Sequence, residues 1–136
     1  MADPRAFISF DCAHNDGDKT LFVRQSKNSK TPFTIQDWSA RSTLPQSEWE
    51  AIVRDKINAC NILIVLVGKQ TAGVYSVVQE IGMAKDQDVP VFGIYVGRAN
   101  ANSDLPVRLP RNRTIKWDWN QIAAAIQQMM TEGKNS

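Results

Sequence analysis

An uninterrupted apolar run lies near the middle of the chain, within residues 61–68. Leucine and β-branched residues in such a run are typical of a strand buried on both faces in a parallel sheet. After a short polar loop, apolar side chains recur at the spacing of one helix face: Val77, Ile81 and Ala84. Ser76 with Gln79 forms a capping box, which predicts that this helix begins with Ser76 as its N-cap. We expect the fold to be organised around this strand–loop–helix unit.

Strand-like and helix-like patterns alternate along the rest of the chain. Four more strands are expected, at residues 5–10, 33–38, 90–96 and 114–117. The second of these alternates apolar and polar positions, as an edge strand with one wet face does. Three further helices are expected. One of two to three turns around residues 21–25 follows the polar loop 15–18, a second covers residues 46–59, and the last begins after a cap at Asp118. This alternation predicts an α/β, three-layer fold with a parallel sheet of about five strands, in the flavodoxin-like order 2-1-3-4-5.

Composition narrows the class of protein. The 136 residues suffice for one domain, 1–136, with a frayed tail at about 132–136. Apolar residues make up 43% and charged residues 22%, as in globular proteins, and the net charge of +2 does not suggest nucleic acid or a membrane as a partner. The chain shows no apolar run of membrane-spanning length and no signal-peptide core, so a cytoplasmic location is expected. Cys12 and Cys60 lack metal-ligand spacing and are interpreted as reduced thiols.

A candidate site follows from the predicted topology. In the order 2-1-3-4-5 the strand order reverses between the first and third strands, and open α/β sheets bind ligands in the crevice at that point. The loops that begin at Ser9 and at Gly68 would flank this crevice. The following polar and aromatic residues should therefore converge there: Ser9, Phe10, Asp11, Thr71, Ser76 and Glu80. Glu80 lies at the edge of the apolar helix face, close to the carboxyl end of the central strand.

Several familiar chemistries do not fit these residues. Neither a dinucleotide-binding nor a P-loop glycine pattern is present. His14 is the only histidine and has no matching nucleophile and base, and no residues recur at metal-ligand spacing, so no metal site is expected. A phosphate-accepting receiver domain would need an aspartate at the end of the third strand, where Val67 and Gly68 stand.

Four segments together resemble a known family. They are Phe7 to Phe10, the segment Asp37-Trp38-Ser39, the run Ile62 to Gly68 with Thr71, and the pair Glu80-Ile81 followed by Ala84. In this order they are similar to the TIR-like family, most closely to the bacterial (ThsB-like) branch used in Thoeris-type anti-phage defence. The resemblance covers about residues 5–95. Relatives often have tryptophan where this chain has Ser76.

The resemblance implies an enzyme that cleaves the bond between nicotinamide and ribose in NAD⁺, with Glu80 at the catalytic position. In the defence branch the ADP-ribose moiety is closed into a cyclic ADP-ribose isomer, a diffusible signal that activates a separate effector protein. NAD⁺ is then the substrate, and no cofactor is implied. Many TIR domains are active only when assembled, so a homo-oligomer and a phage-derived trigger are further partners to consider.

Roles for other residues follow from the same resemblance. Phe10 or Trp38 is expected to stack on nicotinamide or adenine, and Arg41 to contact the pyrophosphate. Polar contacts with the substrate are expected from a further set: Ser9, Asp11, Asp37, Thr71 and Ser76.

Two other classes of function remain open. A non-catalytic TIR-like module would bind other TIR domains through its surface helices, and a flavodoxin-type sensor would bind a nucleotide without turnover. For both, Glu80 has a structural explanation, since the helix dipole favours a carboxylate in the first turn of a helix by about 0.3–1 kcal/mol. Replacement of Glu80 distinguishes the enzyme from the interaction module.

Overall fold

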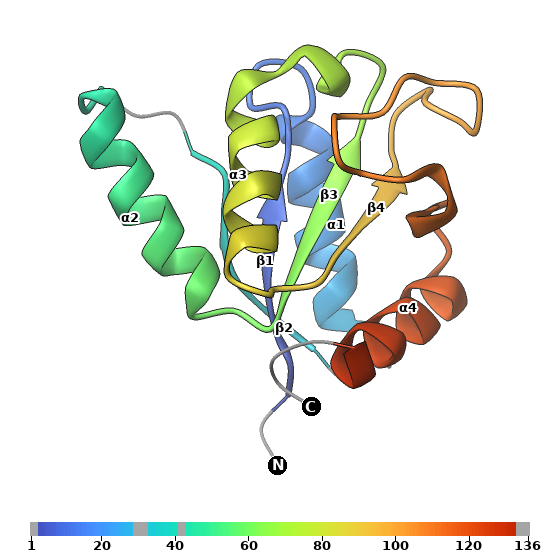
Figure 1. The fold of residues 1–136 in the computed structure, drawn as a ribbon. Helices are drawn as coiled ribbons and strands as arrows, with labels where there is room; N and C mark the ends of the chain where they lie inside the picture. The colour runs from blue at the N-terminus through green and yellow to red at the C-terminus, as the bar shows by residue number, and fades with distance from the viewer. Residues whose placement is uncertain (1–2, 29–32, 41–42, 133–136) are drawn as a thin grey trace.

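The computed structural model describes residues 3–28, 33–40 and 43–132. Its centre is a parallel sheet in the order β2-β1-β3-β4-β5 (Figure 1). The strands are β1 (Arg5–Ser9), β2 (Thr34–Trp38), β3 (Ile62–Val67), β4 (Val91–Tyr95) and β5 (Thr114–Ile115). The predicted order is confirmed, and so is the position of β2 at an edge. β5 is shorter than the predicted strand 114–117.

Helices cover both faces of the sheet (Figure 1). They are α1 (Asp16–Asn28), α2 (Gln46–Asn58), α3 (Tyr75–Asp86) and α4 (Trp119–Glu132), with two 3₁₀ turns, η1 (Thr71–Gly73) and η2 (Arg111–Arg113). One apolar core lies between the sheet and α1 and α4, and the other lies between the sheet and α2 and α3. Alternate residues of β3 enter each core, which explains why its sequence is apolar without interruption. No helix in the described ranges is long and apolar enough to cross a membrane.

Helix starts differ from the prediction at two of four places, and α2 begins at Gln46 as predicted. α3 begins at Tyr75 after Val74, so Ser76 lies inside the first turn and is not the N-cap. The 3₁₀ turn η1 leads directly into this helix through the bond from Val74 N–H to the Thr71 carbonyl, 3.0 Å. α1 begins at Asp16, inside the predicted loop, because acidic residues of its first turn complement the helix dipole. The cap at Asp118 is confirmed: its Oδ1 accepts the Asn120 N–H at 2.9 Å.

Helix α4 extends to Glu132, the first residue of the tail predicted at about 132–136. This residue still belongs to α4, and its carboxylate pairs with Arg113 at 3.0 Å. The remainder of the predicted tail, 133–136, lies outside the described residues.

Candidate active site around Glu80

Glu80 lies in the second turn of α3, with its side chain turned toward the carboxyl ends of β1 and β2. Ser9, the last residue of β1, donates a hydrogen bond to Glu80 Oε1 at 2.6 Å. Ser39, directly after β2, donates a second hydrogen bond to the same oxygen, also at 2.6 Å. Glu80 Oε2 receives no hydrogen bond from the described residues. One carboxylate oxygen is therefore fixed by the two serines.

The backbone around Ser39 holds its hydroxyl in place. The Ser39 N–H donates to the Ile8 carbonyl at 2.9 Å, which continues the pairing of β2 with β1 past the strand end. The Phe10 N–H donates to Ser39 Oγ at 3.2 Å, so this oxygen accepts from the backbone while it donates to Glu80. Three elements thus hold the carboxyl group of Glu80: β1, β2 and α3.

Burial controls the charge of Glu80. Only 1% of the residue is exposed, and the loss of water raises the pKa of its carboxyl group from 4.5 to about 7. The hydrogen bonds from Ser39 and Ser9 lower this pKa, but by less than burial raises it. Near neutral pH both the protonated and the ionised form of Glu80 are therefore populated. The position in the second turn also weakens the helix-dipole explanation, since that effect is largest in the first turn.

The carboxyl group borders a cleft of about 190 Å³. Most of its walls are apolar or aromatic side chains from β1, the end of β2, the segment between β2 and α2, and α2 itself: Phe7, Trp38, Ala40, Leu44, Trp49, Ile52 and Val53. Ser39, Lys56 and Glu80 add the polar groups. Two neighbouring hollows, of about 210 and 370 Å³, share Ala40 with this cleft. An apolar cleft with a few convergent polar groups is the usual form of a small-molecule site.

Besides Glu80, four of the predicted site residues lie in this region. Ser9 binds Glu80, Trp38 lines both the cleft and the larger hollow, and Ser76 lines the smaller hollow beside Tyr75. Trp38 is 38% exposed, so part of its ring is accessible to a ligand. Phe10 also lines the larger hollow, but it is 1% exposed and packs in the core beneath α1 and α4. Trp38 therefore offers the more open aromatic face of the two.

The other predicted residues bond within the protein. Both carboxylate oxygens of Asp11 are occupied in the loop after β1, by the Ala13 N–H at 3.0 Å and by His14 Nδ1 at 2.8 Å. Thr71 Oγ1 accepts the Gly68 N–H at 2.8 Å and closes the turn after β3.

Asp37 forms an ion pair with Lys56 at 3.2 Å. Arg41 lies outside the described residues.

Ser39 and Lys19 are polar residues near the cleft that are not among the predicted site residues. Ser39 belongs to a segment that resembles the family, and its position directly after a strand at the ligand-binding edge is the sequence signal for its role. Lys19 of α1 stands over the rings of Trp38 and Phe10, with its Nζ 4.7 and 5.7 Å from their centroids. The sequence contains no signal for this contact, because it depends on how α1 packs against the end of β2.

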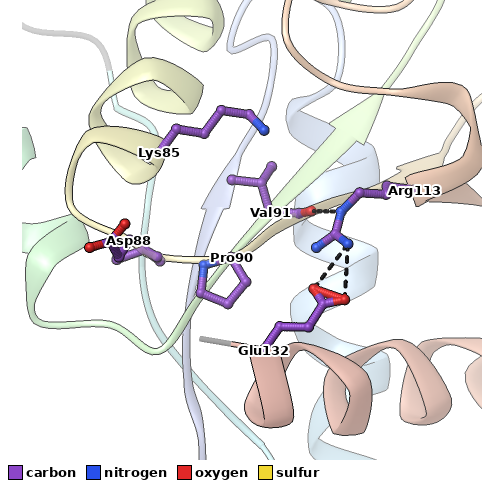
Figure 2. A pocket seen from close by; sticks show the side chains of 7 residues that line it. Lys85, Asp88, Pro90, Val91, Arg113 and Glu132 are labelled. Atoms are coloured by element: carbon purple, nitrogen blue, oxygen red, sulfur yellow. Dashed lines mark hydrogen bonds and ion pairs between the residues drawn. The ribbon is translucent and has the colours of Figure 1, made fainter. Parts of the chain in front are cut away.

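A larger hollow of about 600 Å³ lies at the opposite end of the sheet, near the start of β4 (Figure 2). Arg113 Nε donates to the Val91 carbonyl at 3.1 Å, and the guanidinium group pairs with the Glu132 carboxylate. Dashed lines mark both interactions in Figure 2. These bonds connect the start of β4 with the end of α4, so we interpret Arg113 as a structural link. The described residues include no group of three His, Cys, Asp or Glu that could hold a metal ion.

Comparison with known proteins places the chain beside two groups. The family model described as "Thoeris protein ThsB, TIR-like domain" matches residues 7–101. Among solved structures, the chain is similar to one titled "Crystal Structure of a prokaryotic SEFIR domain", with a TM-score of 0.51 and 13% sequence identity. That match covers 94% of this chain and 90% of the other, and it supports the fold alone. No protein of curated function matches the sequence.

Proposed function

This chain belongs to the TIR-like family of the Thoeris protein ThsB, and we propose that it is an anti-phage defence enzyme that releases nicotinamide from NAD⁺ and cyclises the ADP-ribose moiety. The observation that carries the proposal is the state of Glu80. Its carboxyl group is buried at the strand ends, is held through one oxygen by two serines, and borders an apolar cleft, while no described residue donates a hydrogen bond to the other oxygen.

Bond cleavage draws on the negative charge of Glu80. As the bond between ribose C1′ and nicotinamide N1 breaks, its electron pair goes to the pyridinium nitrogen, and positive charge builds on C1′ as in glycoside hydrolysis. The ionised Glu80 stabilises that charge, and in an apolar cleft this attraction is stronger than in water. Nicotinamide leaves as a neutral molecule, so no second carboxylic acid is needed to protonate it. Ser9 and Ser39 keep the carboxylate in one orientation throughout.

Cyclisation needs the exclusion of water. A hydroxyl of the adenosine ribose attacks C1′, a C–O bond forms, and the hydroxyl proton passes to Glu80 or to solvent. The net products are one nicotinamide, one cyclic ADP-ribose isomer and one proton. Trp38, Leu44 and Ile52 at the mouth are each more than a third exposed, and a bound dinucleotide would cover them and displace water. The cyclic product would then activate a separate effector protein.

The test compares wild-type protein with Glu80→Gln. Purified protein, and lysate of phage-infected cells that express it, are incubated with NAD⁺, and nicotinamide and nucleotide products are followed by mass spectrometry. Asp86→Asn is a matched control, because it also replaces a carboxylate by an amide on α3 but lies on an exposed position at the helix end. We expect nicotinamide and a cyclic product from wild type and from Asp86→Asn, and neither product from Glu80→Gln.

The opposite outcome defines the alternative function. If neither preparation turns over NAD⁺ and Glu80→Gln still protects cells from phage, the enzyme proposal is wrong. The chain would then be a non-catalytic TIR-like module that acts by binding other proteins.

A further inference from the structure

Lys19 is a largely buried cation without a close partner. Its side chain is 15% exposed, and its ion pair with Asp16 is long, 3.9 Å between Nζ and Oδ1. Asp16 itself is 71% exposed, so water screens its charge. Within the described ranges no residue accepts a hydrogen bond from the Lys19 ammonium group, which rests instead on aromatic faces. Buried lysines are normally paired, so this ammonium group is only partly compensated.

The position of Lys19 connects it to the Glu80 cleft. The two rings under its ammonium group, Phe10 and Trp38, line the hollow of about 370 Å³. That hollow shares Trp38, Ser39 and Ala40 with the cleft that Glu80 borders. A ligand that extends from Glu80 past Ser39 would therefore enter a hollow whose two aromatic lining residues also contact the ammonium group of Lys19.

The two carboxylates near this hollow do not balance the positive charge of the Lys19 ammonium group. Asp16 lines the hollow but makes only the long ion pair. Asp11 precedes Cys12, another lining residue, but both of its carboxylate oxygens are occupied by the Ala13 N–H and by His14. A doubly charged anion in the hollow would supply the missing negative charge.

We propose that Lys19 binds the diphosphate of the nucleotide substrate in this hollow, an inference that rests on the proposed function of the Glu80 cleft. The two phosphates of NAD⁺ lie next to the ribose whose bond is cleaved, as the hollow lies next to the cleft. A lysine ammonium group is a compact point charge that suits phosphate oxygens. Trp38, between the two spaces, would separate the ribose at Glu80 from the phosphates at Lys19.

Calorimetric titration with two probes tests this assignment. ADP-ribose carries the diphosphate and adenosine lacks it. A charge-assisted hydrogen bond of about 1.5–3 kcal/mol corresponds to a 10- to 100-fold change in affinity. We therefore expect Lys19→Met to weaken ADP-ribose binding about 10- to 100-fold and to leave adenosine binding unchanged, whereas Lys19→Arg should retain part of the affinity. Lys69→Met is the matched control, since Lys69 is an exposed lysine in the loop after β3.

The titrations require no turnover, so the two proposals can fail separately. Selective loss of ADP-ribose binding in Lys19→Met without any NAD⁺ cleavage by wild type would support the diphosphate site and reject the enzyme. NAD⁺ cleavage by wild type with an unchanged KM in Lys19→Met would support the enzyme and reject the assignment of Lys19 to the diphosphate. Wild-type protein that does not bind ADP-ribose, or equal binding by a folded Lys19→Met variant, overturns the assignment of Lys19. Thermal unfolding of each variant confirms that it is folded.

Discussion

Replacing Glu80 by glutamine should stabilise the protein at pH 8 and have little effect at pH 4. The folded protein holds the pKa of Glu80 at about 7, against 4.5 for an ordinary glutamate, because burial penalises the charged form. Between these two pH values the folded state binds more protons at this group than the unfolded state does. The free energy of unfolding therefore falls as pH rises through this window. Glutamine has nearly the same shape and no charge, so it does not titrate.

The size of the effect follows from the two pKa values. At 1.36 kcal/mol per pKa unit, the ionised Glu80 costs about 3 kcal/mol at pH 8, and the residual cost at pH 5 is below about 1 kcal/mol. Ser9 and Ser39 can still donate to the carbonyl oxygen of the glutamine, so their bonds need not be lost. For a chain of this length we expect the melting temperature of Glu80→Gln to exceed that of wild type by about 10 °C at pH 8.

Urea unfolding at pH 4, 5, 6, 7 and 8 measures the difference directly. The gain in unfolding free energy of Glu80→Gln over wild type should rise steadily with pH and level off above pH 7. Asp86→Asn, at an exposed position of the same helix, should show no such rise. A gain that is the same at pH 5 and pH 8 would refute the desolvation argument. A loss of stability at pH 8 would mean that the ionised carboxylate is favoured by its surroundings.

Three further predictions concern the rate, the cleft and the turn after β3. In a pH–rate profile, nicotinamide release should increase with pH and reach half its maximum near pH 7 as Glu80 ionises. Ser39→Ala should shift this midpoint to higher pH, because the substitution removes a hydrogen bond that lowers the pKa of Glu80. Trp38→Ala should raise the KM for NAD⁺ about 10-fold with a smaller change in kcat, measured by steady-state kinetics. Gly68→Ala should lower the urea-derived unfolding free energy by about 1–3 kcal/mol, since its Cβ would lie 2.4 Å from Asn15 Oδ1.

The sheet order could be predicted because burial dictates the hydrophobic period of each strand. The run at β3 has no polar position since its two faces enter two different cores, whereas β2 alternates because it lies at the edge. The predicted crevice between the ends of β1 and β3 differs from the observed cleft, which lies at the ends of β1 and β2 and against α2. Glu80, on the helix after β3, reaches across to these strand ends. Helix starts were less predictable, because the turn at Thr71 rather than Ser76 determines where α3 begins.

The details of the site depend on contacts that distant segments make. Ser39 reaches Glu80 only because β2 pairs with β1 to its last residue, and a serine after an edge strand has no special local pattern. Asp11 follows β1 as a ligand-binding residue would, yet local bonds to Ala13 and His14 occupy its carboxylate. Short polar side chains often form hydrogen bonds with the backbone of their own loop, and the sequence does not show whether they bind this backbone or a ligand.

The cost of burying Glu80 favours a functional explanation over a structural one. A residue needed only to accept hydrogen bonds from Ser9 and Ser39 could be glutamine, which makes the same bonds without an ionisation penalty of about 3 kcal/mol. The boundary of the α3 apolar face likewise requires no charge. What glutamine cannot supply is a negative charge, whose attraction for a cation that forms beside it is stronger in an apolar cleft than in water. A positive ligand such as the nicotinamide ribose lowers the pKa of a carboxyl group beside it, so binding of NAD⁺ would favour the ionised form of Glu80.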